Sequence, residues 1–255
     1  MDLGLKGKRA IVTGGSRGIG RAIVDLLTQE GAHVAFCART PAAVEDTAQA
    51  FADRGVTLYR AALDVRDNAA FDSFMANAAN ALGGVDILVS NVTTRIYTTG
   101  DQMWRDCFEV DLLQHIRAVE AVLPKLLDTG AGSVVFVSSI ASVLTNLPPG
   151  EEGYGAMKAA LLNVAGQLAA KHGSAGLRVN SVSPGPILFP GGFWDMVRDK
   201  SPASFERAQK LPALGRLGTD YEVARAVVFL VSPAASYISG ANLRVDGAAV
   251  KTTNY

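Results

Sequence analysis

Tyr154 and Lys158 lie four positions apart in an apolar, proline-free stretch that favours a helix. On a helix this spacing places both side chains on one face, one turn apart. We expect the ammonium to lower the pKa of the phenol, because a neighbouring positive charge favours the phenolate. Such a tyrosine can give a proton to a carbonyl oxygen while a hydride reaches the carbon. The alternative is a Tyr/Lys pair on a solvated helix face, which only the rest of the chain can exclude.

A glycine-rich turn lies near the start of the chain, between an apolar β-branched run at 9–13 and an amphipathic helix expected over 21–29. The turn reads Gly14-Gly15-Ser16-Arg17-Gly18-Ile19-Gly20. Glycines let the backbone approach a pyrophosphate, and the free N–H groups at a helix start attract its charge. A tight turn without a ligand is the alternative. The strand and helix on its two sides favour a dinucleotide site.

The end of the second expected strand, 33–38, favours NADP(H) over NAD(H) as cofactor. An acid at this place would accept from a ribose 2′-hydroxyl, whereas an arginine accommodates a 2′-phosphate. The chain has Arg39 here, and Arg17 in the glycine turn would be a second cation. The alternative is that Arg39 only solvates a loop.

Asp64 and Val65 follow the third expected strand, 56–63. An acid at the carboxyl end of a parallel strand lies on the ligand side of the sheet, so Asp64 could accept from an adenine amino group. It could equally cap the helix that begins near Asn68. A helix over 71–82 and a strand over 85–90, which runs into Asn91, complete this half. The β-α alternation predicts a doubly wound parallel sheet.

The second half begins with a long helical pattern over 104–127. Asp111 interrupts its buried side, and Pro124 near its end predicts a kink. A fifth strand over 133–138 leads to Ser139, although a serine at that edge could simply end a strand.

After the helix over 153–171 comes a sixth strand, 177–183, which stops at Pro184-Gly185. We expect a long irregular segment over 187–218 to form a mobile lid with an apolar wall for the substrate, since long loops in compact domains are more often functional than connective. A subunit contact is the alternative. A short helix over 222–231 and a strand over 242–246 follow.

Composition limits the classes of partner. The 24 basic and 24 acidic residues give no net charge, so electrostatics does not favour nucleic acid or an anionic membrane surface. Two cysteines make neither a disulfide framework nor a metal site, which indicates a reducing compartment. No apolar run reaches the ~18 residues of a membrane helix, and no signal-peptide stretch precedes the first strand. We expect one domain over residues 1–255, located in the cytoplasm.

Together these motifs resemble the short-chain dehydrogenase/reductase family, especially its 3-oxoacyl reductases, from residue 8 to residue 247. The residues that carry the resemblance are Thr13-Gly14-x-x-x-Gly18-x-Gly20, Asp64-Val65, Asn91, Ser139, Tyr154-x-x-x-Lys158 and Pro184-Gly185. The resemblance implies a single Rossmann-type domain with seven parallel strands. It also implies homotetramers or homodimers that pack through the helices at 104–127 and 153–171.

The resemblance implies a role for each site residue. Tyr154 would be the general acid or base, with Lys158 lowering its pKa and holding the nicotinamide ribose. Ser139 would orient the substrate oxygen. Asn91 would lie along the adenosine side of the cofactor, and Ile187 would bond the carboxamide through its backbone.

Three positions depart from the family's pattern. Thr93 stands where the strand-four motif has glycine, and Asp111 stands where an asparagine completes a proton relay. An acid at this position could still hold a relay water, and its charge would favour the protonated Lys158. Phe189 replaces a threonine that contacts the cofactor, so the resemblance does not show how the lid closes.

The sequence therefore predicts an NADP(H)-dependent oxidoreductase that acts on a ketone or secondary alcohol. Five apolar side chains suggest an apolar pocket, which would fit a 3-oxoacyl thioester, a cyclic ketone or a steroid-like alcohol. They are Phe189, Phe193, Trp194, Leu144 and Leu147. The alternatives are a non-catalytic dinucleotide sensor or assembly protein, and a related sugar-nucleotide epimerase, which would need a longer segment after Pro184.

Overall fold

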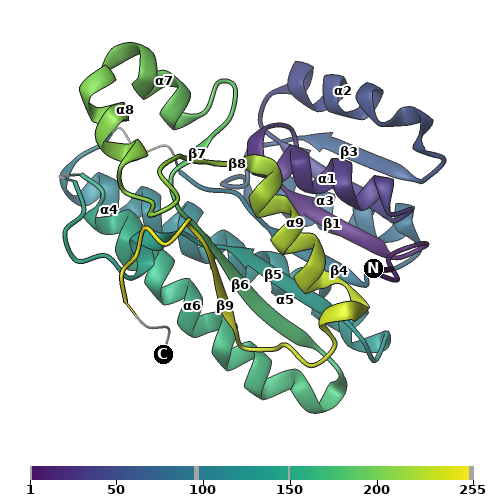
Figure 1. Ribbon diagram of the computed structural model, residues 1–255. Helices are drawn as coiled ribbons and strands as arrows, with labels where there is room; N and C mark the ends of the chain where they lie inside the picture. Colours follow the sequence, from purple (N-terminus) through teal and green to yellow (C-terminus); the bar gives the residue numbers. More distant parts are fainter. Residues whose placement is uncertain (1, 95–97, 149, 253–255) are drawn as a thin grey trace.

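The computed structural model describes residues 2–94, 98–148 and 150–252. In these ranges, seven parallel strands form one sheet in the order β3-β2-β1-β4-β5-β6-β9, which confirms the doubly wound prediction (Figure 1). The strands are β1 (Arg9–Thr13), β2 (His33–Ala38), β3 (Leu58–Ala62), β4 (Ile87–Ser90), β5 (Ser133–Val137), β6 (Arg178–Pro184) and β9 (Asn242–Val245). The strand order reverses between β1 and β4, so the switch point of the sheet lies directly after these two strands.

Helices cover both faces of the sheet (Figure 1). One face carries α1 (Gly18–Gln29), α2 (Pro41–Ala50) and α9 (Asp220–Val231). The other carries α3 (Asn68–Leu82), α5 (Gln114–Asp128) and α6 (Glu152–His172).

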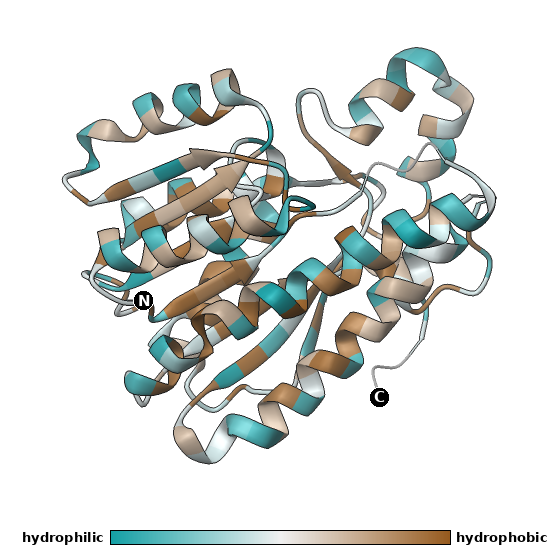
Figure 2. Cartoon of the chain, turned by 180° about the vertical axis from the view of Figure 1, so that it is seen from behind, coloured by the Kyte–Doolittle hydropathy of each residue, from teal (hydrophilic) through white to brown (hydrophobic). Residues whose placement is uncertain are grey.

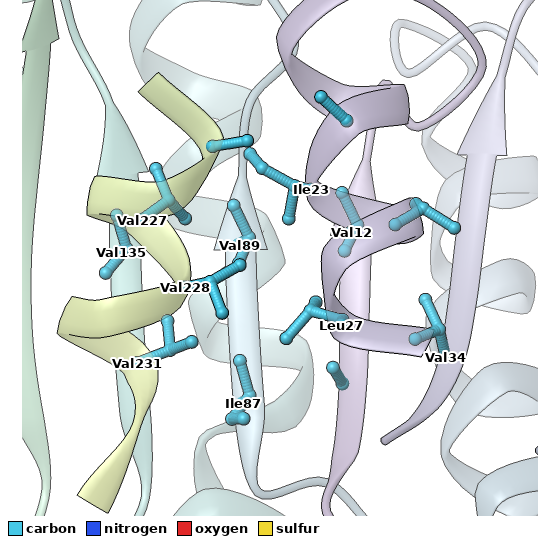
Figure 3. Packing of buried hydrophobic residues seen from close by; sticks show 14 of the residues in the cluster. Val12, Ile23, Leu27, Val34, Ile87, Val89, Val135, Val227, Val228 and Val231 are labelled. Atoms are coloured by element: carbon cyan, nitrogen blue, oxygen red, sulfur yellow. The ribbon is translucent and has the colours of Figure 1, made fainter. Parts of the chain in front are cut away.

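Two apolar cores hold these layers together, one on each face of the sheet. Figure 3 shows the first, where Ile23 and Leu27 of α1 and Val227 and Val231 of α9 meet valines of the strands and Ile87 of β4. Figure 2 shows hydrophobic strands between helices that carry many hydrophilic residues. Because the strands are buried on both faces, they read as continuous apolar runs.

The long helical pattern expected over 104–127 is interrupted. It consists of α4 (Gly100–Phe108), a π-helical segment at Glu109–Leu113 and α5. The irregularity lies at Asp111 rather than at Pro124, since α5 continues through that proline to Asp128. The wider π turn buries the consecutive residues Val110 and Asp111 together.

The prediction of a long irregular segment over 187–218 is wrong. The chain forms α7 (Phe193–Lys200) and α8 (Pro202–Gln209), which lie beyond the carboxyl ends of the strands (Figure 1). A short parallel pair, β7 (Ile187–Leu188) and β8 (Gly218–Thr219), closes the segment at its base. Both helices have only eight residues, which is shorter than the window over which an apolar period is recognised in a sequence.

Among the residues described, no helix is long and apolar enough to cross a membrane. The same residues contain no group of three or more His, Cys, Asp or Glu side chains that could hold a metal ion.

Candidate active site

The glycine turn follows β1 at the switch point of the sheet. A Cβ atom on Gly20 would lie 2.0 Å from the Gly14 carbonyl oxygen, so only glycine allows this turn to close against α1. Gly14 itself has a φ of +72°, in the left-handed region that favours glycine. Helix α1 begins at Gly18, so its first N–H groups face the turn, where an anion can bind them. This cradle fits the pyrophosphate of a dinucleotide.

Packing and hydrogen bonds hold the turn against the elements around it. Ile19 packs against the apolar core, and the Ser16 carbonyl accepts from the Thr47 hydroxyl at 3.3 Å. The Asn91 side-chain amide donates to the carbonyls of Thr13 and Gly14, both at 3.2 Å. Asn91 therefore fastens the turn to the end of β4, a task that the sequence did not indicate.

At the ends of β2 and β3 the structure brings two arginines to one acid. Arg39 is exposed, and its charge lowers the pKa of Asp64 less than Arg66 does. The Arg66 guanidinium donates to both oxygens of Asp64, to Oδ1 at 3.1 Å and to Oδ2 at 2.6 Å. The capping alternative for Asp64 is wrong, because Asp67 accepts from the Ala70 N–H at the start of α3. Val65 is buried in the core.

Tyr154 and Lys158 lie one turn apart on α6, as predicted, with Nζ 5.7 Å from the centre of the phenol ring. Lys158 is only 1% exposed. Its ammonium donates to the Val137 carbonyl at 3.2 Å and pairs with Asp111 Oδ1 at 3.3 Å. The Ser138 hydroxyl donates to the Lys158 carbonyl at 3.1 Å and thus ties α6 to the end of β5.

Asp111 is fully buried and is held by two consecutive threonines. The Thr93 hydroxyl donates to Oδ1 at 2.6 Å, and the Thr94 N–H donates to the same oxygen at 3.2 Å. The Thr94 hydroxyl donates to Oδ2 at 2.5 Å. Two of the departures from the family's pattern, Thr93 and Asp111, are therefore bonded to each other.

The prediction that Lys158 lowers the pKa of Tyr154 is wrong. The pKa of Tyr154 is raised, first by burial and then by the negative charge of Asp111. Hydrogen bonding from the Ser139 and Thr93 hydroxyls opposes this shift without overcoming it. The pKa of Lys158 is lowered by burial, although Asp111 acts in the opposite direction, as expected. Because the ammonium is paired with Asp111, the phenol meets a nearly neutral ion pair rather than a free cation.

Ser139 lies where its predicted role needs it. It begins a short 3₁₀ turn, Ile140–Ser142, and its hydroxyl accepts from the Ala141 N–H at 3.1 Å. The same hydroxyl is close enough to Tyr154 to lower the pKa of the phenol. Ser139, Tyr154, Lys158 and Asp111 thus form one cluster.

The Pro184-Gly185 turn ends β6. A Cβ atom on Gly185 would lie 2.8 Å from the Asp246 Cα atom, so glycine is needed for packing against the end of β9. Ile187 is buried in β7, where it pairs with Gly218.

Phe189 lies against the glycine turn, since a Cβ atom on Gly18 would come within 2.6 Å of its ring. The structure does not place the five predicted pocket residues on one wall. Leu144 packs with Ile140, Ala249 and Val250, and Leu147 contacts Gly155 of α6. Phe193 and Trp194 form an edge-to-face pair on α7, with ring centres 5.1 Å apart.

Sequence reasoning missed three contributions near the site: Thr94, Arg66 and a buried pair in which Ser90 Oγ lies 2.7 Å from His115 Nδ1. Burial and the nearby Lys158 charge hold the pKa of His115 well below its usual range, so its ring is neutral at neutral pH. The sequence could have pointed to Thr94. It follows the fourth strand, and a hydroxyl there can donate to an acid at position 111.

Comparison with known proteins finds relatives over nearly the whole chain. A family model described as enoyl-(acyl carrier protein) reductase matches residues 14–248. Isoepoxydon dehydrogenase from Penicillium expansum is 35% identical over 251 residues, which cover 97% of this chain and 96% of that protein. The 3-oxoacyl-[acyl-carrier-protein] reductase from Escherichia coli is 36% identical over 253 residues, with 96% and 98% covered.

A solved structure shares the fold as well. L-sorbose reductase from Gluconobacter frateurii, in complex with NADPH and L-sorbose, superposes with a TM-score of 0.88 at 30% identity. The match covers 99% of this chain and 100% of that one.

Proposed function

Because the chain belongs to the short-chain dehydrogenase/reductase family, we propose that it is an NADP(H)-dependent oxidoreductase that moves a hydride between nicotinamide and a ketone or secondary alcohol. The observation that carries this proposal is the cluster of Ser139, Tyr154 and Lys158 beside the sheet edge that bears the glycine turn. A proton donor and a dinucleotide cradle at one edge suit carbonyl reduction.

The residues present fit a nicotinamide dinucleotide, which would supply the hydride when bound. The glycine turn and the start of α1 would hold its pyrophosphate. Ser139 would orient the carbonyl oxygen, and Tyr154 would give it a proton. The raised pKa of Tyr154 keeps the phenol protonated over the whole physiological range, as a proton donor must be, although it also makes the phenol a weaker acid than a free tyrosine. Lys158 would hold the nicotinamide ribose.

The preference for NADP(H) rests on the cations at the ends of the first strands. Arg39 is exposed after β2 and lies near Asp64, which is already paired with Arg66. Arg17 in the turn adds another exposed cation. The solved relative in complex with NADPH is consistent with this preference.

Affinities for NADPH and NADH, measured by fluorescence titration, test the cofactor assignment. Arg39→Asp should reduce the preference for NADPH by roughly tenfold or more, because it replaces a partner of the 2′-phosphate by a like charge. An unchanged ratio of affinities would show that Arg39 does not discriminate. Exposed Arg105 on α4 offers a matched control, and Arg105→Asp should leave the ratio as it is.

We propose an apolar substrate, such as a 3-oxoacyl thioester, a cyclic ketone or a steroid-like carbonyl. Two apolar side chains support it: Leu147, which contacts Gly155 next to Tyr154, and Phe189, which lies against the glycine turn. NADPH oxidation with a panel of these three classes and a keto sugar would rank them. A clear preference for the keto sugar would contradict an apolar site.

Replacement of Tyr154 by phenylalanine tests the function itself. Turnover should fall by at least ~10²-fold while NADPH binding persists, since the phenol oxygen is the proton donor. Full activity in this variant would refute the role of Tyr154. Tight NADPH binding by the wild-type protein, with no turnover of any carbonyl in the panel, would favour a dinucleotide sensor.

A further inference from the structure

The Thr93 hydroxyl is hydrogen-bonded to two groups of the site, the Asp111 carboxylate and the Tyr154 phenol. It donates to Asp111 Oδ1 at 2.6 Å, and its hydrogen bonding also reaches the Tyr154 phenol. Thr93 is exposed, whereas Asp111 is fully buried. The hydroxyl therefore stands at the boundary between the open site and the buried ion pair.

We propose that Thr93 is a proton-relay residue, whose hydroxyl connects Tyr154 to the buried Asp111–Lys158 ion pair and returns the proton that Tyr154 gives to the substrate. This inference rests on the proposed function, in which Tyr154 is the proton donor.

The geometry defines each proton transfer. A threonine hydroxyl has one proton and two lone pairs, so it can donate to Asp111 while it accepts from the neutral phenol. When the Tyr154 proton moves to the carbonyl oxygen, as a hydride reaches the carbon, a phenolate remains. The Thr93 proton then moves to that phenolate, and the Thr93 oxygen takes a proton from the Asp111 carboxyl group.

Lys158 supplies the proton that Asp111 passes on. The two groups lie 3.3 Å apart, and transfer from ammonium to carboxylate leaves a neutral amine and a neutral acid. Burial lowers the pKa of Lys158, which makes this loss easier than for an exposed lysine. The amine then takes a proton from solvent, so that one proton enters for each one delivered.

Three other titratable groups lie around the cluster, and the directions of their pKa shifts are known. Cys107 on α4 has a pKa raised to about 12, chiefly by burial. His115 on α5 is neutral, because its pKa lies well below the usual range. Glu151, just before α6, raises the pKa of Tyr154 as the last of the named causes. Burial also raises the pKa of Glu151 itself, so the pH dependence of the site reflects Tyr154, Lys158 and Glu151.

Thr94 provides a matched control, since its hydroxyl also donates to Asp111 but does not take part in the hydrogen bonding that shifts the pKa of Tyr154. Thr93→Val and Thr94→Val each remove one hydroxyl from the same carboxylate. Thr93→Ser keeps the relay hydroxyl. Thr93→Ala serves in place of Thr93→Val if the latter fails to fold.

The first measurement is NADPH-dependent reduction of the best ketone as a function of pH. Thr93→Val should lower kcat by roughly 10- to 100-fold with little change in the KM for NADPH, because it removes a proton-transfer group. Thr94→Val should show a clearly smaller loss, and Thr93→Ser should keep most of the wild-type kcat. Equal losses in the two valine variants would overturn the relay.

The second measurement needs no cofactor. Tyrosinate absorbance is titrated in each variant and compared with Tyr154→Phe, which isolates the Tyr154 signal. Thr93→Val should raise the pKa of Tyr154 further, since one donor to the phenolate is gone, while Thr94→Val should not. An identical Tyr154 titration in Thr93→Val and wild type would overturn the proposal.

The two proposals can fail separately. An inactive Tyr154→Phe together with a fully active Thr93→Val would leave the proposed function intact and remove Thr93 from the relay. An active Tyr154→Phe would remove both.

Discussion

Replacing Asp111 by asparagine removes one buried charge and leaves the hydrogen bonds around it nearly in place. The described residues make four contacts with the carboxylate, and three of them, from Thr93, the Thr94 N–H and Lys158, go to Oδ1. An asparagine with its oxygen at this position keeps them. Its amide can donate to the Thr94 hydroxyl, which at present donates to Oδ2 and is also able to accept. The change in the free energy of unfolding on this substitution therefore reports the contribution of the Asp111 charge.

The separation of 3.3 Å between Lys158 Nζ and Asp111 Oδ1 sets the upper limit of the effect. At an effective dielectric constant near 20, two unit charges at this distance attract by about 5 kcal/mol before desolvation is counted. A buried charge that loses its partner typically costs about 3–5 kcal/mol. Lys158 would keep the Val137 carbonyl as an acceptor and can lose its proton. We therefore expect Asp111→Asn to lower the free energy of unfolding by roughly 3 kcal/mol, the bottom of that range.

Lys158→Met should cost at least about 1 kcal/mol less than Asp111→Asn, because the Asp111 carboxylate keeps three hydrogen-bond donors from the threonines. The double substitution removes both charges, so its cost should fall short of the sum of the single ones by roughly 2 kcal/mol. Urea unfolding at neutral pH measures all four proteins, with equal m-values as the condition for comparing them.

Asp72→Asn, an exposed change of the same kind on α3, is the control and should stay within about 0.5 kcal/mol of wild type. Strict additivity of Asp111→Asn and Lys158→Met would refute the coupling. A loss below about 1 kcal/mol for Asp111→Asn would refute the argument that Lys158 depends on this charge.

Three further predictions concern the turn and the surrounding fold. Gly20→Ala should abolish NADPH binding in a fluorescence titration, because its Cβ atom would lie 2.0 Å from the Gly14 carbonyl oxygen; retained affinity would mean that the turn can open. Arg178→Met should lower the free energy of urea unfolding by roughly 2–4 kcal/mol, since four carbonyls at and after the end of α9 lose their donor; a loss under about 1 kcal/mol would contradict this. The pKa of Glu222 is lowered to about 2, chiefly by the Arg216 guanidinium, so its stabilising effect is complete above its ordinary pKa of 4.5 and is lost as the pH falls toward 2. The difference in Tm between wild type and Glu222→Gln should therefore shrink over this range, and a constant difference would exclude the ionised carboxylate as its cause.

The strand and helix pattern was predictable because each element carries a local signal. The strands are buried on both faces and read as short apolar runs, and six of the helices begin or end within a few residues of the predicted limits. The segment over residues 187–218 is different. Helices α7 and α8 have eight residues each and bury only Ala208, so they are too short for an apolar period to be recognised in the sequence.

The identities and the spacing of Tyr154, Lys158, Ser139 and the glycines by themselves determined the family, the edge of the sheet that bears the site and the class of chemistry expected there. Each of these follows from a repeat of a few residues or from the ends of consecutive strands. The sign of the Tyr154 pKa shift was decided only by the tertiary structure. Asp111 is 43 positions from Tyr154 in the chain, and the π-helical segment turns it inward onto Lys158 and the two threonines. Spacing along a helix reports which residues are neighbours on that helix, whereas the field at a buried phenol is the sum over every charge that the fold brings near it.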